Sequence, residues 1–150
     1  MQETMKQIFY SLLIMTLTLT LCVSCSQEDD LNTLFVGKTW YITDVRLNGS
    51  IKGEDLKPVY ESGSSAYYIQ FTANQFQGTL SNGTSISGTW GADGKDKTIN
   101  MRVITSTGKQ TQFDTNLLSI IKNLRNYDGD ANIMFLKQDN ANYIKCATKR

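Results

Sequence analysis

Cysteine is the residue type with the clearest chemical potential in this chain. The sequence holds three cysteines, Cys22, Cys25 and Cys146, and no histidine. Without histidine, Ser-His and Cys-His catalysis and the commonest zinc ligand are excluded. Cys146 shares a strand face with Ile144, so we predict a small buried side chain there, not a nucleophile. Cys22 and Cys25 must be judged by their position near the N-terminus.

Pairs of carboxylates are the other candidates for chemistry. The pairs Asp93/Asp96 and Asp128/Asp130 offer oxygen ligands of the type that calcium prefers, but they lack the spacing of an EF-hand loop. Each pair lies beside glycine or lysine, where aspartate commonly stabilises a turn, so we predict turns and no metal or other cofactor. Asp44 lies on a predicted strand with no evident catalytic partner. We therefore expect that the protein is not an enzyme.

The N-terminal segment is typical of a secretory signal. An apolar run from Ile8 to Val23 follows Lys6 and is shorter than the roughly 20 residues that a membrane-spanning helix needs. It ends in Cys-Val-Ser-Cys (residues 22–25), which resembles a bacterial lipobox with small Ser24 before the modified cysteine. Cys22 stands where that motif usually has leucine. The resemblance implies cleavage before Cys25 and attachment of lipid to Cys25.

An acidic run follows the predicted lipidation site. Glu28, Asp29 and Asp30 resemble the surface-export signal of lipoproteins in the Bacteroidetes. The resemblance implies an outer-membrane, lipid-anchored protein on the cell surface. The alternative is a solvated linker that its charges keep unfolded. We divide the chain into a signal peptide (1–24), a lipidated flexible acidic linker (25–34) and one domain (35–150).

The charge of the chain is nearly balanced. Fifteen basic and fourteen acidic side chains give a net charge of +1, with no basic cluster. A nucleic-acid partner is not expected, because neutralising phosphates requires concentrated positive charge.

The domain has the alternating pattern of short strands. We predict strands near 39–47, 66–72, 75–80, 85–90, 98–104, 132–138 and 142–148, and a weak strand at 109–113. Tyr67, Ile69 and Phe71 should face inward and Tyr68 outward. Asn82-Gly83 is a strong hairpin signal. Gly78 and Gly88, within strands, indicate bends or close backbone approaches.

Two segments depart from this alternation. Residues 48–65 are polar, contain the only proline, and are predicted to form a long loop. Apolar residues at helical spacing predict a helix over 116–126, with Asp114-Thr115 as N-caps and its apolar stripe on the sheet.

Gly37-Lys38-Thr39-Trp40 resembles the Gly-x-x-Trp near the start of lipocalin-like domains. The segment from Phe76 to Trp90 and the late helix resemble the small lipocalin-like and META-like domains of Bacteroidetes lipoproteins. The resemblance implies a mainly β fold: an antiparallel lipocalin-like barrel of seven or eight strands, with one helix before the last hairpin. Closing the sheet would also remove exposed strand edges.

The leading functional hypothesis is a binding module for a small apolar ligand or a short glycan. Its predicted pocket is lined by the large inward side chains Trp40, Ile69, Phe71, Phe76, Ile86, Trp90 and Met101. An eight-stranded barrel either holds one small ligand or is filled by its own side chains. The alternative is therefore a solid-core lipoprotein that binds an envelope protein partner through its outer surface, the 48–65 loop and Tyr68.

Overall fold

The computed structural model describes residues 29–48, 67–81 and 84–149. Within them, eight antiparallel strands pair in sequence order, and the last strand pairs with the first to close a barrel. The strands are β1 (Thr39–Arg46), β2 (Tyr68–Phe71), β3 (Gln75–Thr79), β4 (Ser85–Asp93), β5 (Thr98–Thr107), β6 (Asn126–Gly129), β7 (Ile133–Lys137) and β8 (Tyr143–Ala147). The predicted mainly β fold is therefore confirmed.

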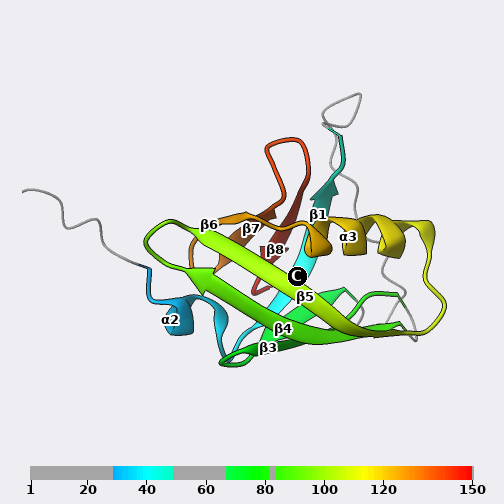
Figure 1. Cartoon of the computed structure of the whole chain (residues 1–150), viewed down its shortest axis with the longest axis horizontal. Helices are drawn as coiled ribbons and strands as arrows, with labels where there is room; N and C mark the ends of the chain where they lie inside the picture. Colours follow the sequence, from blue (N-terminus) through cyan, green and yellow to red (C-terminus); the bar gives the residue numbers. More distant parts are fainter. Residues whose placement is uncertain (1–28, 49–66, 82–83, 150) are drawn as a thin grey trace, which may run out of the picture.

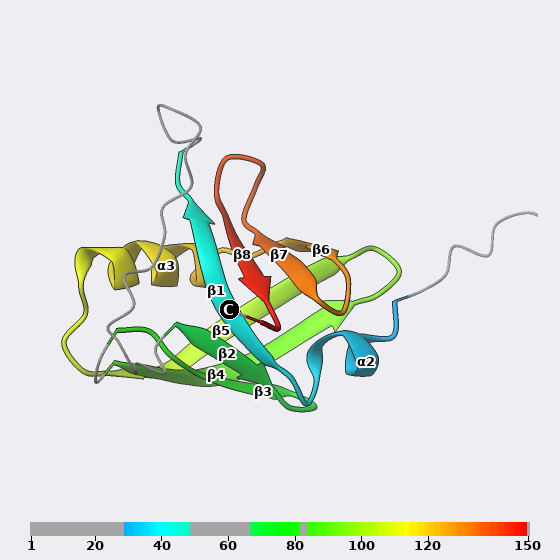
Figure 2. The same ribbon diagram turned by 180° about the vertical axis from the view of Figure 1, so that it is seen from behind.

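Two helices in the described ranges, α2 (Leu31–Phe35) and α3 (Gln112–Lys122), lie at opposite ends of the long axis of the molecule (Figures 1 and 2). Helix α2 lies beside the turn that joins β4 to β5, and α3 precedes the last three strands. No helix in the described ranges is long and apolar enough to cross a membrane.

Alternation along the strands fills the barrel with apolar side chains. On β2, Ile69 and Phe71 are buried, whereas Tyr68 and Gln70 are half-buried on the outer face. Glycine allows the strands to approach closely, as predicted. A Cβ atom on Gly88 would lie 2.0 Å from the carbonyl oxygen of Arg102, and one on Gly78 would lie 2.4 Å from that of Tyr68. Only glycine fits at these two positions without a shift of the neighbouring strand.

Helix α3 begins four residues earlier than predicted, so the N-caps predicted at Asp114 and Thr115 are wrong. Thr111 is the N-cap, and its hydroxyl accepts a hydrogen bond from the amide of Asp114. The Asp114 carboxylate in turn accepts hydrogen bonds from the amide and hydroxyl of Thr111, at 2.7 and 2.8 Å. This reciprocal capping box starts the helix where a weak strand at 109–113 was predicted, and that strand is absent.

The predicted end of the helix at residue 126 is also wrong, because β6 begins there. The helix ends at Lys122, and the amide of Arg125 already donates to the carbonyl of Lys137 on β7. Strand β6 is short and has one buried side chain, Tyr127, so it carries no alternating pattern. It forms an extended ladder with β7 but pairs with β5 only at Thr98 and Asn126. Helix α3 packs where β5 diverges from β6.

Candidate functional site

The seven side chains predicted to line a pocket all lie inside the barrel. They come from β1 through β5, each is at most 9% exposed, and all belong to one apolar core. Aromatic rings contact one another at the α2 end of this core. The rings of Phe71 and Trp90 lie 4.9 Å apart in an edge-to-face arrangement, and Phe76 lies 6.5 Å from Phe71. Edge-to-face contacts of this kind stabilise a packed core.

Phe35 occupies the centre of this aromatic cluster, although it was not among the side chains predicted to face the interior. It is fully buried, and its ring lies 5.1 to 5.3 Å from the rings of Phe71, Trp90 and Tyr127. Helix α2 therefore inserts an aromatic side chain into one end of the barrel. The signal was present in the spacing of Leu31, Leu34 and Phe35, which is the i, i+3, i+4 pattern of a helix face.

The two tryptophans differ in hydrogen bonding. The indole N–H of Trp90 donates to the carbonyl of Thr72 at 2.9 Å. The indole N–H of Trp40 is buried and has no hydrogen-bond partner. Burying a polar group without a partner costs free energy. Among the seven side chains predicted to line a pocket, Trp40 is therefore the one whose polar atom is available for a further contact.

Two of the acidic residues in the predicted export signal take part in the fold. The carboxylate of Asp29 accepts a 2.9 Å hydrogen bond from the hydroxyl of Tyr127 and lies 3.7 Å from the ammonium of Lys97. Asp30 is the N-cap of α2 and accepts hydrogen bonds from the amides of Asn32 and Thr33. Among the described residues, Asp29 and Asp30 thus already contact the domain, although they lie within the segment predicted to be a flexible linker. Glu28 and Cys25 lie outside the described residues.

Asp30 also accepts a 2.7 Å hydrogen bond from the hydroxyl of Thr33. This bond is the main reason that the pKa of Asp30 lies below its ordinary value. The ionised form of Asp30 is therefore favoured by the same contacts that start α2.

The aspartates proposed as alternative calcium ligands bind backbone amides in turns. The Asp93 carboxylate accepts hydrogen bonds from the amides of Lys95 and Asp96, at 2.8 and 3.2 Å. The Asp130 carboxylate accepts them from Asn132 and Ile133, at 2.7 and 3.0 Å, and these bonds lower the pKa of Asp130. Across the described ranges, no group of three potential ligands gathers around a common point.

The remaining candidates for catalysis have structural environments. Asp44 lies 3.9 Å from the ammonium of Lys145 on the neighbouring strand. Cys146 is buried, as predicted, and burial raises the pKa of its thiol to about 12. A thiol with that pKa is protonated at neutral pH, and the thiolate is the reactive form.

The long loop predicted at 48–65 lies outside the described residues, except for Asn48. Tyr68, its predicted neighbour on the outer surface, is half-buried on β2 and forms one wall of a surface hollow of about 270 Å³. That hollow also includes Gln77 and Ser87, from β3 and β4. Polar side chains and one tyrosine therefore gather on the outside of the sheet.

The comparisons with known proteins agree with this fold. A family model described as "Domain of unknown function (DUF4847)" matches residues 26–147. The chain is similar to the crystal structure of a DUF4847 family protein from Bacteroides vulgatus, with 25% identity and a TM-score of 0.62, over 80% of this chain and 98% of that one. A search of the curated proteins finds no match. The specific resemblance to lipocalin-like and META-like domains is not confirmed by these matches.

Proposed function

The chain belongs to the DUF4847 family, whose function is unknown, and we propose that it is an exported lipoprotein that acts through the outer surface of a filled barrel. In this proposal Cys25 carries a lipid that inserts into the outer membrane, and the barrel binds a partner at the cell surface. The role is binding, not catalysis.

The packing of Phe35 is the observation that carries the solid-core proposal. Phe35 is fully buried and contacts Phe71 and Trp90, two of the seven side chains expected to line a pocket. A side chain of the protein itself therefore takes the position that a ligand would need at this end of the barrel. A filled barrel presents its outer surface to partners.

The N-terminal motif supports the membrane anchor, and the position of Asp29 indicates which end of the barrel would lie near the membrane. The amide of Asp29 donates to the carbonyl of Gly94, and its side chain contacts Tyr127 and Lys97, which fixes residue 29 to the barrel. Four residues of chain span at most about 14 Å. A lipid on Cys25 would therefore hold the α2 end of the barrel near the membrane and direct the α3 end away from it, because the two helices lie at opposite ends (Figure 2).

The proposed lipid anchor at Cys25 is tested by replacing this cysteine. The Cys25→Ala variant should lose incorporation of labelled palmitate and move from the membrane fraction to the soluble fraction. The control is Cys146→Ala, which removes a buried thiol and should leave the protein in the membrane fraction. Retention of the Cys25→Ala variant in membranes would contradict the anchor.

A second candidate function is the lipocalin-like carrier, and one observation favours it. The buried indole N–H of Trp40 has no hydrogen-bond partner. An acceptor atom on a small bound molecule would satisfy it. The corresponding test is native mass spectrometry of protein extracted under mild conditions, in which the carrier predicts a bound small molecule that is absent from Trp40→Phe.

A further inference from the structure

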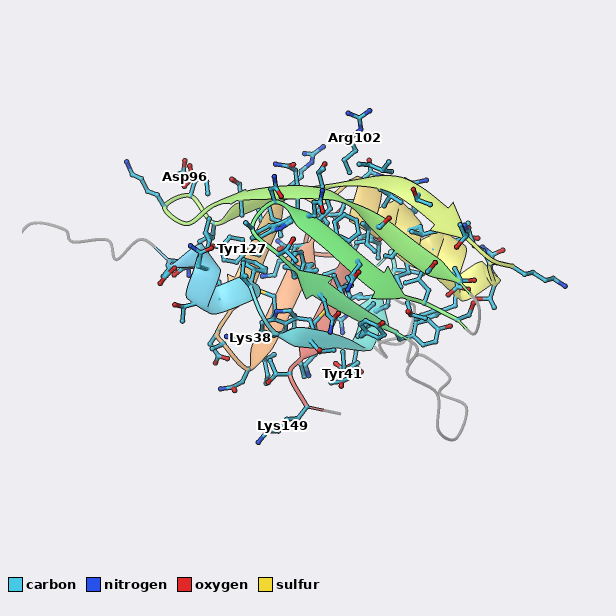
Figure 3. All side chains as sticks on the ribbon, turned by 90° about the horizontal axis from the view of Figure 1, so that it is seen from below. Lys38, Tyr41, Asp96, Arg102, Tyr127 and Lys149 are labelled. Carbon is cyan, nitrogen blue, oxygen red and sulfur yellow. The ribbon has the colours of Figure 1, made fainter. Side chains whose placement is uncertain are left out.

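The outer face of β1 to β5 carries two rows of uncharged polar side chains. The strand registers align one row across the five strands: Thr39, Gln70, Gln77, Ser87 and Thr105. The same registers align the neighbouring row: Tyr41, Tyr68, Thr79, Ser85 and Thr107. Figure 3 views these strands side by side, with Tyr41 on β1 at one edge and Arg102 on β5 at the other. We call the two rows together the neutral face.

Hydrogen bonds between side chains order part of the neutral face. The amide of Gln77 donates to the amide oxygen of Gln70 at 3.1 Å, and the amide of Gln70 donates to the hydroxyl of Thr39 at 2.8 Å. In the other row, the hydroxyls of Ser85 and Thr107 lie 2.7 Å apart. A ligand that binds such a face has little side-chain entropy to remove, because these groups are already ordered.

The neutral face is hollowed as well as polar. Two hollows, of about 260 and 270 Å³, share Gln77 and Ser87 as lining residues. One extends from this shared wall to Tyr68, and the other extends to Ile104. The shared wall makes them neighbours along the sheet, so an extended molecule would contact both. Tyr68 and the 67%-exposed Ile104 give this path apolar surface at its two ends.

The chemistry of the neutral face selects a class of ligand. None of its ten side chains carries a charge at neutral pH, so it offers no counter-charge to phosphate, sulfate or a metal ion. Amides and hydroxyls both donate and accept hydrogen bonds, as the hydroxyls of a sugar do. A tyrosine ring adds a flat apolar surface with a polar edge. Protein interfaces, by contrast, have apolar centres rich in aromatic residues, methionine and arginine.

We propose that the neutral face binds an uncharged oligosaccharide in the two adjoining hollows. This inference rests on the proposed function, because it requires a protein that acts through its outer surface. Gln77 lies in both hollows, so it contacts the central sugar and supplies hydrogen bonds. Tyr68 supplies the ring at one end of the path.

Binding is tested with the full-length lipoprotein in detergent, by affinity electrophoresis in gels that contain one polysaccharide each. The neutral probes are an α-glucan, a β-glucan and a mannan, and the charged probes are heparin and polygalacturonate. At least one neutral polymer should retard the protein more strongly than either charged polymer does. Retardation by the charged polymers alone, or by none of the five, overturns the inference.

The binding surface is tested by a pair of variants. Tyr68→Ala/Gln77→Ala should weaken retardation by the neutral polymer by about tenfold, which corresponds to about 1.4 kcal/mol. The matched control is Tyr143→Ala, which removes a half-buried tyrosine from β8, a strand outside the neutral face. Near-ultraviolet circular dichroism verifies that both variants are folded. Equal weakening in the two folded variants, or none in the double variant, overturns the assignment of the neutral face.

Failure here is distinguishable from failure of the proposed function. If Cys25→Ala releases the protein from membranes but no neutral polymer retards it, only the oligosaccharide inference is lost. If Cys25→Ala stays in the membrane fraction while a neutral polymer binds the protein, the assignment of the lipid anchor is wrong and the assignment of the neutral face as a binding site stands.

Discussion

The hydroxyl of Tyr127 donates a 2.9 Å hydrogen bond to the carboxylate of Asp29, across 98 residues of chain. Asp29 is the first described residue, and Tyr127 lies on β6, which pairs weakly with β5. The bond therefore joins the segment before α2 to the least paired part of the barrel.

Removing the Tyr127 hydroxyl should destabilise the protein modestly. Tyr127→Phe keeps the ring that contacts Phe35 but removes the donor to Asp29. We expect the free energy of unfolding to fall by about 1.5 kcal/mol, the lower end of the usual range for a hydrogen bond to a charged group. Urea denaturation measures it. Combining Tyr127→Phe with Asp29→Ala should cost less than the sum of the two single changes, because each change removes the same bond, and full additivity would show that the bond contributes nothing.

Removing the Phe35 ring tests whether α2 is part of the core. Phe35→Ala leaves a cavity among Phe71, Trp90 and Tyr127. We expect a loss of about 3–5 kcal/mol, as for other buried aromatic residues. Phe35→Leu is the matched control and should retain most of the stability, because it refills much of the space. A loss below about 1 kcal/mol in Phe35→Ala would mean that α2 detaches easily from the barrel.

The predicted export signal can be tested without disturbing α2. Replacing Glu28, Asp29 and Asp30 by alanine would also remove the N-cap of α2, because Asp30 caps it. Glu28→Gln, Asp29→Asn and Asp30→Asn together remove the charge and keep acceptor oxygens, and asparagine caps helices about as well as aspartate. The amide variant should stay anchored but become resistant to protease added to intact cells. If it is still digested from outside, the charges are not the signal.

Acid should destabilise the protein through three aspartates. Hydrogen bonds from Thr33, Asn132 and Asn142 are the leading causes that lower the pKa values of Asp30, Asp130 and Asp139, respectively. A pKa that is lower in the folded state than in the unfolded state stabilises the protein at pH values above the unfolded pKa of 3.8. This stabilisation is lost as the pH falls through the pKa of the folded state. Thermal melting between pH 6 and about pH 2 should therefore show a decline below pH 3.8. Changing all three residues to asparagine should flatten the decline; an equally steep decline contradicts the assignment.

Strands such as β2 and β8 were predictable from sequence because each buries one face. Ile69 and Phe71 on β2, and Ile144 and Cys146 on β8, alternate with half-buried neighbours in the pattern that defines a half-buried strand. The late helix was predictable for the same reason, since Leu117 and Ile121 recur at helical spacing. Its start was misplaced because Asp114 can be read as an N-cap or as the acidic partner in a capping box.

Other elements could not be predicted because their stability comes from distant contacts. Strand β6 has one buried residue, Tyr127, and exists because β7 supplies its ladder. Helix α2 is a single short turn held by Phe35 in the core, and helices of that length are unstable alone. The neutral face could not be predicted from sequence either. Tyr68 was identified from alternation, but its alignment with Thr79 and Ser85 depends on strand register.

The central claim is that the barrel is filled and acts through its outside, and fluorescence of Trp40 and Trp90 tests it most directly. Both indoles are buried in the core. Titration with a series of apolar molecules, from short alcohols to long fatty acids, should leave their emission unchanged, with Trp90→Phe separating the two signals. A saturable emission change at micromolar ligand, lost in Trp40→Phe, would contradict the account and establish the barrel as a carrier.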